Sequence, residues 1–356
     1  MTLNRIGLVV HGGREEAAAG KLLVRAWCTE HGVDCVDIDV WDEGKRRNAR
    51  EEMAAAGDPD LIVTLGGDGT FLRGARLAAS IDSLLLGVDL GRVGFLTEVP
   101  ISDVLNALDA VLTEQIRIED RMLLTVRVSR RPELPPDLEN WAATYGRGPL
   151  LPIPKVRTDG KTDDGWGIPL NVTALNDVVL EKFSRDRQVS VGVYISGRLL
   201  ASYSADALLV ATPTGSTAYS FAAGGPVVSP RAEALVFTPV APHMAFNRTV
   251  VTGPDEAVGL RVLERSGRAA VTIDGQLRGV LEPGDWIGVY AARKRLRAVR
   301  LGSTDFYGRL RERMNLTDAP AAVADGTAAP FWSFTSAPPA DLAHLHLETD
   351  PEADAQ

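Results

Sequence analysis

The stretch that decides the fold is LIVTLGGDGTFLRGARLAA, residues 61–79. Its first five residues form a short apolar run, rich in β-branched side chains, of the kind that parallel sheets bury. A glycine-rich turn with a single acid follows at 66–69, and apolar residues then recur with helical spacing. This order predicts a strand, a turn and a helix, with the turn outside the carboxyl end of the strand, where open α/β sheets bind ligands.

The same alternation continues on both sides of this turn. Apolar runs at 5–10, 33–40, 61–65 and 83–90 predict strands. Helical spacing predicts helices at 15–32, 44–57, 71–80 and 101–115, the first two closed by Gly32 and Gly57. Alternating strands and helices indicate an open α/β domain over residues 1–120.

The pattern changes to β-structure after about residue 121. Residues 131–170 are rich in proline, glycine and charge, which predicts a surface insertion. Many short strands follow, among them 198–212, with hairpin-turn signals at 196–197 and 274–275. We therefore predict a β-sandwich domain over 121–300.

Two further segments end the chain. A late amphipathic helix is predicted at about 303–316 and is expected to join the first domain. Residues 317–356 are rich in alanine, proline and acids, which predicts a disordered tail.

Composition narrows the class of protein. Hydrophobic residues make up 45% of the 356 residues and charged residues 24%, as in ordinary soluble proteins. The net charge of -9 argues against a nucleic-acid-binding protein. From the pattern of apolar and basic residues we expect no signal peptide and no membrane-spanning helix. Cys28 and Cys35 are too few for a disulfide framework and fit a reducing cytoplasm, where we expect each to be a small buried residue.

The glycine-flanked acid suggests phosphate chemistry. Glycines at 66, 67 and 69 let a ligand approach the main chain, and Thr70 is the predicted N-cap of the next helix. Free N–H groups at a helix start favour a phosphate, and an ionised Asp68 beside them could accept a hydroxyl proton. The alternative is a plain tight turn. The motif is neither the P-loop pattern nor the dinucleotide-fold pattern.

A second constellation lies at 206–230, DALLVATPTGSTAYSFAAGGPVVSP. Hydroxyls of the turn at 212–217 suit sugar hydroxyls and phosphate oxygens, and the Tyr219 ring suits a purine. The alternative is a capped loop with a buried tyrosine. Upstream, Asn176 and Asp177 stand side by side after an apolar run. An amide beside a carboxylate can bind adenine edges and ribose hydroxyls, and the alternative is again a turn.

Together GGDGT, the ND pair and TPTGSTAYS followed by GGP resemble the NAD kinase family. The resemblance runs from about residue 5 to about 316, apart from the insertion. GGDGT is shared with diacylglycerol and sphingosine kinases, whereas TPTGSTAYS is far more specific to NAD kinases. The resemblance implies a Rossmann-like α/β domain followed by a β-sandwich domain. It also implies phosphoryl transfer from ATP, or polyphosphate in some members, to the 2'-hydroxyl of the adenosine ribose of NAD.

The resemblance also implies residue roles. Asp68 is the expected proton acceptor. The expected dinucleotide-binding residues are Gly69, Arg73, Asn176, Asp177, Arg187, Asp206, Thr217, Ala218, Tyr219, Ser220, Ala222 and Gln276. Mg²⁺ is expected to be carried mainly by the donor phosphates, without protein ligands, and a homodimer or homotetramer is expected. Asp89 stands where many members carry asparagine, and Asp177 replaces the commoner glutamate.

Two rival functions share parts of this pattern. A lipid kinase would keep GGDGT but would need an apolar acceptor pocket, and the polar PTGSTAY loop counts against it. A non-catalytic NADP(H)-binding module would keep the fold, and the intact Asp68 counts against that.

Overall fold

The structure is a computed structural model that describes residues 3–41, 48–91, 94–135, 153–157, 167–183, 188–302 and 306–316. The chain divides into two compact units, 1–306 and 307–356, which are described separately. The second unit holds nearly all of helix α7 (Phe306–Arg313). This helix lies within the predicted late helix, and its predicted place beside the first domain stays a prediction.

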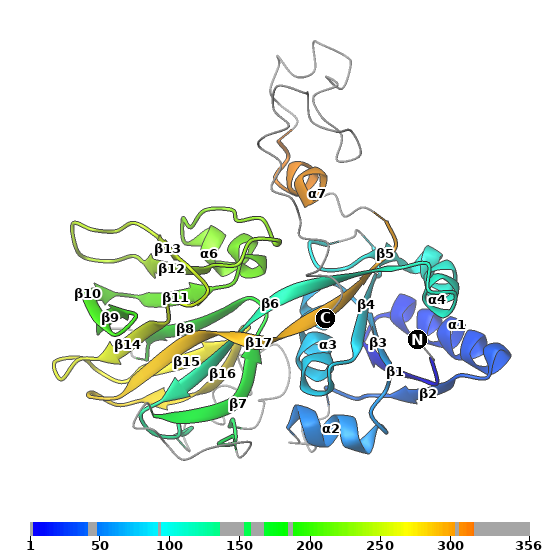
Figure 1. Ribbon diagram of the computed structural model, residues 1–356, viewed down its shortest axis with the longest axis horizontal. Helices are drawn as coiled ribbons and strands as arrows, with labels where there is room; N and C mark the ends of the chain where they lie inside the picture. The colour runs from blue at the N-terminus through cyan, green and yellow to red at the C-terminus, as the bar shows by residue number, and fades with distance from the viewer. Residues whose placement is uncertain are drawn as a thin grey trace, which may run out of the picture. The chain divides into compact units, whose positions relative to one another are not determined.

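The N-terminal half contains the predicted parallel sheet (Figure 1). Its strands lie in the order β4-β3-β1-β2. Their bounds are β1 (Arg5–Val10), β2 (Asp34–Asp37), β3 (Leu61–Leu65) and β4 (Leu84–Asp89). All neighbours in this set pair in parallel. Every residue of β3 and β4 is buried, as expected for central strands covered on both faces.

Helices cover both faces of this sheet. On one face α1 (Glu15–His31) contacts α4 (Val104–Leu112), and Trp27 Nε1 donates to Asp109 Oδ1 at 2.7 Å. On the other face α2 (Ala49–Ala55) contacts α3 (Asp68–Ile81). Leu61, Val63 and Leu65 pack with α1 and α4, whereas Ile62 packs with α2 and α3. The strand alternation therefore divides the core into two layers.

The helix ends follow local signals in the sequence. Gly32 ends α1 in the left-handed conformation with φ 67°, as predicted. The predicted helix 44–57 is described only from residue 48, and α2 begins there with a capping box between Asn48 and Glu51. The predicted helix 101–115 is a short 3-10 turn, η1 (Ile101–Asp103), followed by α4.

Among the described residues the strands lie in two sheets. The larger sheet has eleven strands there: it contains β1 to β4 of the N-terminal half and adds β5 (Val99–Pro100), β6 (Arg117–Val128), β7 (Ile168–Ala174), β9 (Val189–Ile195), β10 (Arg198–Ala205), β14 (Val258–Val262) and β17 (Trp286–Arg300). The smaller sheet contains β8 (Asp177–Lys182), β11 (Ala207–Ala211), β12 (Leu235–Val240), β13 (Val250–Thr252), β15 (Ala269–Ile273) and β16 (Gln276–Leu281). One hydrophobic cluster packs residues of both sheets together. The predicted class, an α/β domain followed by a β-sandwich, is confirmed.

One long strand belongs to both halves. The first part of β17 pairs with β14 and β6, and its last part pairs in parallel with β4, Arg297 opposite Leu84. Figure 1 shows β17 and β6 running from the β-rich half to the α/β half. The parallel sheet and the larger β sheet are thus continuous, and the domain division at 120/121 stays a prediction.

The segment predicted as a single strand at 198–212 is two strands. β10 lies at the edge of the larger sheet, and β11 lies inside the smaller one. The chain changes sheets at Asp206, whose amide donates to the carbonyl of Val240 at 3.0 Å. Residues of β10 and β11 lie in the same hydrophobic cluster, so the crossing places consecutive strands on the two sides of one core, which the local pattern does not show.

The predicted insertion is shorter than expected at its end. Residues 168–170 already belong to β7, and bridges join Val156 to Leu170 and Glu133 to Val280.

Cys28 is buried, Cys35 is half-buried, and both are free thiols. Among the described residues, no helix is long and apolar enough to cross a membrane. The predicted disordered tail at 317–356 lies outside the described residues.

Candidate active site

The glycine-rich turn leads directly into α3. The helix begins at Asp68 with Gly67 as its N-cap, so the prediction of Thr70 as N-cap is wrong. Thr70 is instead the third helical residue, buried against Gly66, where an added Cβ would lie 2.2 Å from Thr70 Oγ1. The Thr70 amide donates to the carbonyl of Gly67 at 2.9 Å, so the helix already includes Thr70 and the open amides of its first turn are those of Asp68 and Gly69.

The Asp68 carboxylate packs against the loop that contains Phe95 and Leu96. Its two oxygens accept N–H bonds from Phe95 at 3.2 Å and Leu96 at 3.1 Å. A Cβ on Gly94 would lie 2.1 Å from Asp68 Oδ1, so only glycine leaves room for this carboxylate. Two backbone amides of this loop therefore hold the Asp68 carboxylate, whereas the sequence suggested an unshielded group.

Asp89 forms further hydrogen bonds with this loop. It is buried at the end of β4, accepts the Gly91 N–H at 2.7 Å, and lies 3.4 Å from Thr97 Oγ1. Thr97 Oγ1 in turn accepts the Gly94 N–H at 2.6 Å. Asp89 thus acts as an acceptor within the loop, a role that needs no amide donor.

Arg73 lies one turn further along α3 and stacks on an aromatic ring. Its guanidinium carbon lies 4.1 Å from the ring centroid of Trp41. Trp41 Nε1 donates to the carbonyl of Val10 at 2.8 Å, which fixes the ring at the end of β1. Burial, together with the nearby Arg76, lowers the pKa of Arg73. Sequence reasoning missed Trp41, because nothing local links it to a helix thirty residues later.

The Asn176–Asp177 pair is held by a third residue. The buried carboxylate of Asp274 accepts the backbone N–H groups of Leu175, Asn176 and Asp177 at 2.8, 2.7 and 3.2 Å. Asp274 itself adopts the left-handed conformation with φ 47° in the predicted 274–275 turn. The sequence signalled that turn and missed its function, which is to fix the backbone of the pair.

Two carboxyl groups near this turn have raised pKa values. Burial, with a smaller contribution from the neighbouring Asp274, raises the pKa of Asp177 to about 7. Burial also raises the pKa of Asp274 to about 6, against the three amides and Arg278, which lower it. Carboxyl groups whose pKa values are raised in this way are common at functional sites.

The 212–217 turn is fastened to the same pair. Thr212 donates its hydroxyl to the carbonyl of Leu175 at 2.5 Å and accepts the Gly215 N–H at 3.0 Å. A Cβ on Gly215 would lie 2.0 Å from the carbonyl oxygen of Asn176, so the approach requires glycine. Leu175 also belongs to one hydrophobic cluster with Phe71 of α3, which brings the two motifs to one region of the fold.

The hydroxyls of this turn do not line an open site. Thr212, Thr214 and Ser216 are buried, with 0%, 5% and 0% of their surface exposed. Ser216 Oγ donates to the carbonyl of Pro213 at 2.7 Å, and Thr214 Oγ1 accepts from Arg121 at 3.2 Å. The prediction that these three hydroxyls bind sugar or phosphate is therefore wrong, because the turn itself uses them.

Tyr219 is exposed at the start of the short helix α6 (Tyr219–Ala222). Its pKa is raised by burial and by three neighbouring carboxylates, those of Glu181, Asp177 and Asp206. The ring therefore lies in an acidic environment that also contains two predicted site residues. Tyr219 was predicted as a stacking surface, and an exposed ring suits that role.

The remaining predicted residues lie around α6 or near it. Thr217 and Ala218 are half-buried, Ala222 is exposed, and the Ser220 hydroxyl is buried against Thr238 Oγ1 at 3.0 Å. Asp206 pairs with Lys182 at 2.8 Å. Gln276 begins β16 directly after the 274–275 turn, and Gly69 is exposed in the first turn of α3. Arg187 lies outside the described residues.

A buried ionic network joins the two motifs. Arg300 on β17 donates to Glu119 at 2.6 Å, to Glu98 at 3.1 Å and to the carbonyl of Leu96 at 3.2 Å. Glu119 also pairs with Arg121 at 2.8 Å, and Arg121 reaches Thr214 of the second motif. Sequence reasoning missed this network, whose members lie far apart along the chain.

No group of three or more His, Cys, Asp and Glu side chains in the described ranges is placed to hold a metal ion.

Family models and known proteins agree with this geometry. The ATP-NAD kinase N-terminal domain matches residues 6–116, and the ATP-NAD kinase C-terminal domain matches residues 175–301. The fold is similar to that of a yeast NADH kinase complexed with NADH, with TM-score 0.66 and 20% identity over 90% of this chain and 89% of that one. It is also similar to an Archaeoglobus fulgidus NAD kinase in complex with ATP, with TM-score 0.58 and 20% identity over 86% and 98%.

Curated relatives extend the similarity over the whole chain. NAD kinase 1 of Streptomyces avermitilis is 73% identical over 351 residues, which cover 99% of this chain and 98% of the relative. NAD kinase 1 of Streptomyces coelicolor is 74% identical over 98% of this chain and 95% of the relative. The resemblance in the motifs is thereby confirmed, and the chain belongs to the NAD kinase family.

Proposed function

We propose that the chain transfers the terminal phosphoryl group of ATP, or of polyphosphate, to the 2'-hydroxyl of the adenosine ribose of NAD and so makes NADP. The observation that carries this proposal is the position of Asp68, whose carboxylate is held by the amides of Phe95 and Leu96 at the start of α3. Open N–H groups at this helix start favour a phosphate, and the carboxylate beside them favours a hydroxyl group.

Asp68 orients the ribose hydroxyl and accepts its proton during transfer. General-base catalysis of this kind contributes about 10²- to 10⁴-fold in rate. Gly69 and Arg73 lie near the phosphates, and the Trp41 ring holds Arg73 in place. Most of the remaining rate comes from alignment of the hydroxyl with the donor phosphate, which the fixed loops supply.

The second motif binds the dinucleotide. Asn176 and Asp177 face the adenosine, with their backbone fixed by Asp274, and the exposed Tyr219 ring stacks on a base. The proposed site also contains Thr217, Ala218, Ser220, Ala222, Asp206, Gln276 and Arg187.

Mg²⁺ is proposed as the cation of the reaction. Mg²⁺ is usually held by one or two carboxylates together with substrate phosphates and water. Asp68 offers a carboxylate at the start of α3, where the phosphates are proposed to bind, so the residues present fit an ion that is carried mainly by the donor. Such an ion would neutralise charge on the transferred phosphoryl group.

Self-association through the β half is proposed as well. β10 forms one edge of the larger sheet and exposes Leu199 and Leu200 at 58% and 42%. Exposed apolar residues on an edge strand favour contact with another chain. A homodimer or homotetramer and a cytoplasmic location are proposals that rest on the family resemblance.

The test is an acceptor assay with a matched pair of variants. Purified protein, Mg²⁺ and ATP or polyphosphate are given NAD, NADH, diacylglycerol or sphingosine, and NADP(H) formation is followed with an NADP-specific dehydrogenase. Asp68→Asn is expected to bind NAD but to lose at least 10²-fold in turnover. Asp82→Asn, at the opposite end of the same helix, keeps its left-handed conformation and its activity. Equal turnover of Asp68→Asn and the unmodified enzyme contradicts the base assignment, and phosphorylation of a lipid in place of NAD contradicts the proposed reaction.

A further inference from the structure

A second cavity lies at the opposite end of α3 from Asp68. It has a volume of about 700 Å³ and is bounded by the C-terminal half of α3, the start of α2, strands β6, β7 and β17, and residues 153–157. Arg76 is the nearest α3 residue in its wall, eight residues after Asp68. At about 1.5 Å per residue, the two lie about 12 Å apart along the helix axis. The cavity is therefore separate from the catalytic acid and of a size that suits a small molecule.

The wall of this cavity is strongly basic. Its cationic residues are Arg50, Arg76, Arg127, Lys155, Arg157, Arg278, Arg293 and Lys294. Among the described residues that line it, none carries a carboxylate. A cavity lined by one sign of charge concentrates ions of the opposite sign.

Three of these cations are neutralised by acids outside the wall. Arg76 pairs with Glu52 at 2.9 Å. Arg50 pairs with Asp58, and Lys155 pairs with Glu51. Ion pairs within the protein therefore account for these three cations but not for the other basic residues of the wall.

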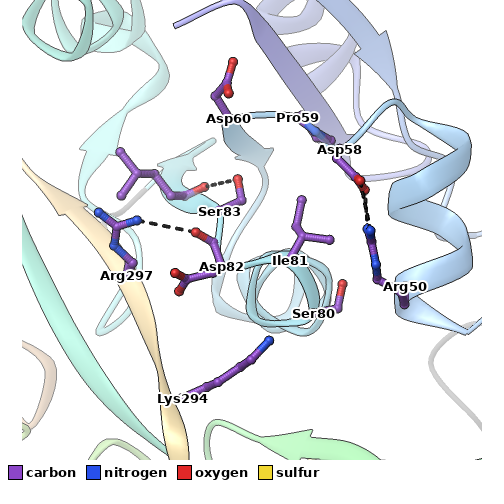
Figure 2. Close-up of a pocket in the computed structure, with 11 residues that line it drawn as sticks. Arg50, Asp58, Pro59, Asp60, Ser80, Ile81, Asp82, Ser83, Lys294 and Arg297 are labelled. Atoms are coloured by element: carbon purple, nitrogen blue, oxygen red, sulfur yellow. Dashed lines mark hydrogen bonds and ion pairs between the residues drawn. The ribbon is translucent and has the colours of Figure 1, made fainter. Parts of the chain in front are cut away.

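The nearby aspartates lie in a neighbouring cavity of about 430 Å³ (Figure 2). That cavity is lined by Asp58, Asp60 and Asp82, and it shares Arg50 and Lys294 with the basic one. Figure 2 shows Asp58 directed at Arg50, whereas Lys294 extends alone beside the end of α3.

The buried, unsatisfied guanidinium of Arg278 points to a ligand. Its side chain lines the cavity but is buried, with 6% of its surface exposed, and its Nε has no hydrogen-bond partner. Burial and the neighbouring Arg76 lower its pKa to about 9, and Asp274 offsets this only in part. A buried guanidinium with an unsatisfied donor destabilises the fold unless an anion accepts the hydrogen bond and balances the charge.

Two more cations face the cavity without a partner. Arg293 and Lys294 are exposed on β17. Neither forms a hydrogen bond or ion pair with another residue in the part of the chain that the structure describes. Arg278, Arg293 and Lys294 thus leave at least three positive charges for a ligand, more than a single carboxylate needs.

We propose that this cavity binds a small oligophosphate anion at a site distinct from the active site. Guanidinium groups bind phosphate oxygens in pairs, and a lysine adds a point charge. Several phosphates in one ligand match the several cations in the wall. Asn171 and Thr173 line the same cavity and can form hydrogen bonds to such an anion. The phosphates of free polyphosphate and those of a nucleotide share this chemistry.

The test measures the reactivity of Lys294, an exposed residue in the wall of this cavity. The full-length protein is acetylated with an amine-reactive reagent, with and without tripolyphosphate, ATP or adenosine, and each lysine is quantified by mass spectrometry. At about ten times its dissociation constant, a bound anion slows Lys294 labelling about tenfold. Lys21 on α1, which pairs with Asp37, serves as the internal control. Its labelling rate should not change when an anion is added.

The ligand arms identify the source of the phosphates. Protection of Lys294 by tripolyphosphate assigns the site to free polyphosphate, and protection by ATP alone assigns it to a nucleotide. Either result supports the oligophosphate site. Protection by adenosine, or no protection by tripolyphosphate and ATP at millimolar concentration, overturns it.

Variants link the protection to Arg278. Arg278→Met fills the same buried space without a charge and is expected to abolish protection. Arg261→Gln, which removes an exposed charge on β14, is expected to keep it. If Arg278→Met does not fold, Arg293→Gln is expected to raise the dissociation constant of the anion about threefold, the size of effect typical of one exposed ion pair. Unchanged protection in a folded Arg278→Met protein, or in Arg293→Gln where Arg278→Met does not fold, contradicts the site.

Discussion

The guanidinium of Arg300 lies 2.6 Å from the carboxylate of Glu119 and also donates to the carbonyl of Leu96. The amide of Leu96 holds Asp68, and Glu119 holds Arg121, which contacts Thr214 of the second motif. A single ionic network between β17 and β6 therefore supports both halves of the proposed site.

Glu119→Gln is expected to destabilise the fold. Although burial raises the pKa of Glu119, Arg121 and Arg300 hold it below its usual range, so the carboxylate is charged and balances two guanidinium groups. Loss of one partner in a buried ion pair costs about 3 kcal/mol. Urea denaturation at neutral pH should show this loss. Glu30→Gln, at an exposed position of α1, is the control, and equal stability of the two variants would show that the network is not needed.

Gly94→Ala is expected to impair turnover more than NAD binding. The new Cβ would lie 2.1 Å from Asp68 Oδ1 and would displace the carboxylate from its two amides. A misplacement of about 1 Å can cost about 10²-fold in rate. Steady-state kinetics measure the effect. Gly267→Ala, with no atom within 4 Å of the added Cβ, should behave like the unmodified enzyme.

Tyr219→Ala is expected to raise the Michaelis constant for NAD about tenfold, since a stacked ring is worth about 1.4 kcal/mol. The Michaelis constant for ATP should change less. Tyr219→Phe keeps the ring and should restore most of the affinity. Phe221→Ala removes a ring of the same 41% exposure on the same short helix and is the matched control. Equal changes for NAD and ATP would argue against stacking.

Asp177→Asn is expected to change the pH dependence of stability. The folded pKa of Asp177, about 7, lies above its ordinary value of about 4. A raised pKa stabilises the fold fully below about pH 4 and loses that stabilisation as the pH rises through about 7. The variant should therefore match the unmodified protein at low pH and unfold at higher temperature near neutral pH and above.

Thermal unfolding across this pH range checks the prediction. Asp103→Asn, at an exposed position, is the control. Asp274→Asn should instead destabilise the protein, because its carboxylate accepts three backbone amides that an asparagine cannot all satisfy. An Asp177→Asn protein that is less stable than the unmodified protein at every pH would contradict the burial argument.

The local parts of the fold were predictable from the sequence. Residues 61–79 have an apolar run, a glycine-rich turn and helical spacing within twenty positions, and all three concern neighbours in the chain. The same holds for the end of α1 at Gly32 and for the 274–275 turn. Short-range sterics and the burial of one face decide such features, so the pattern carries them. The start of α3 was misjudged because both Gly67 and Thr70 are acceptable caps by local preference.

The role of Asp274 and the network around Arg300 depended on the tertiary structure. Asp274 lies 98 residues from Asn176, and Arg300 lies 204 residues from Leu96. No spacing rule connects charges at such separations, since their energies depend on which groups the core places together out of water. The change of sheets at Asp206 has the same cause.

The sequence by itself thus determined the alternating elements, the position of the proposed catalytic aspartate and the family. The tertiary structure decided what holds that aspartate, which hydroxyls form hydrogen bonds inside the turn, and which cations have no partner among the described residues. The physical reason is that hydrophobic periodicity acts between near neighbours, whereas the pairing of buried charges depends on contacts made only in the folded chain.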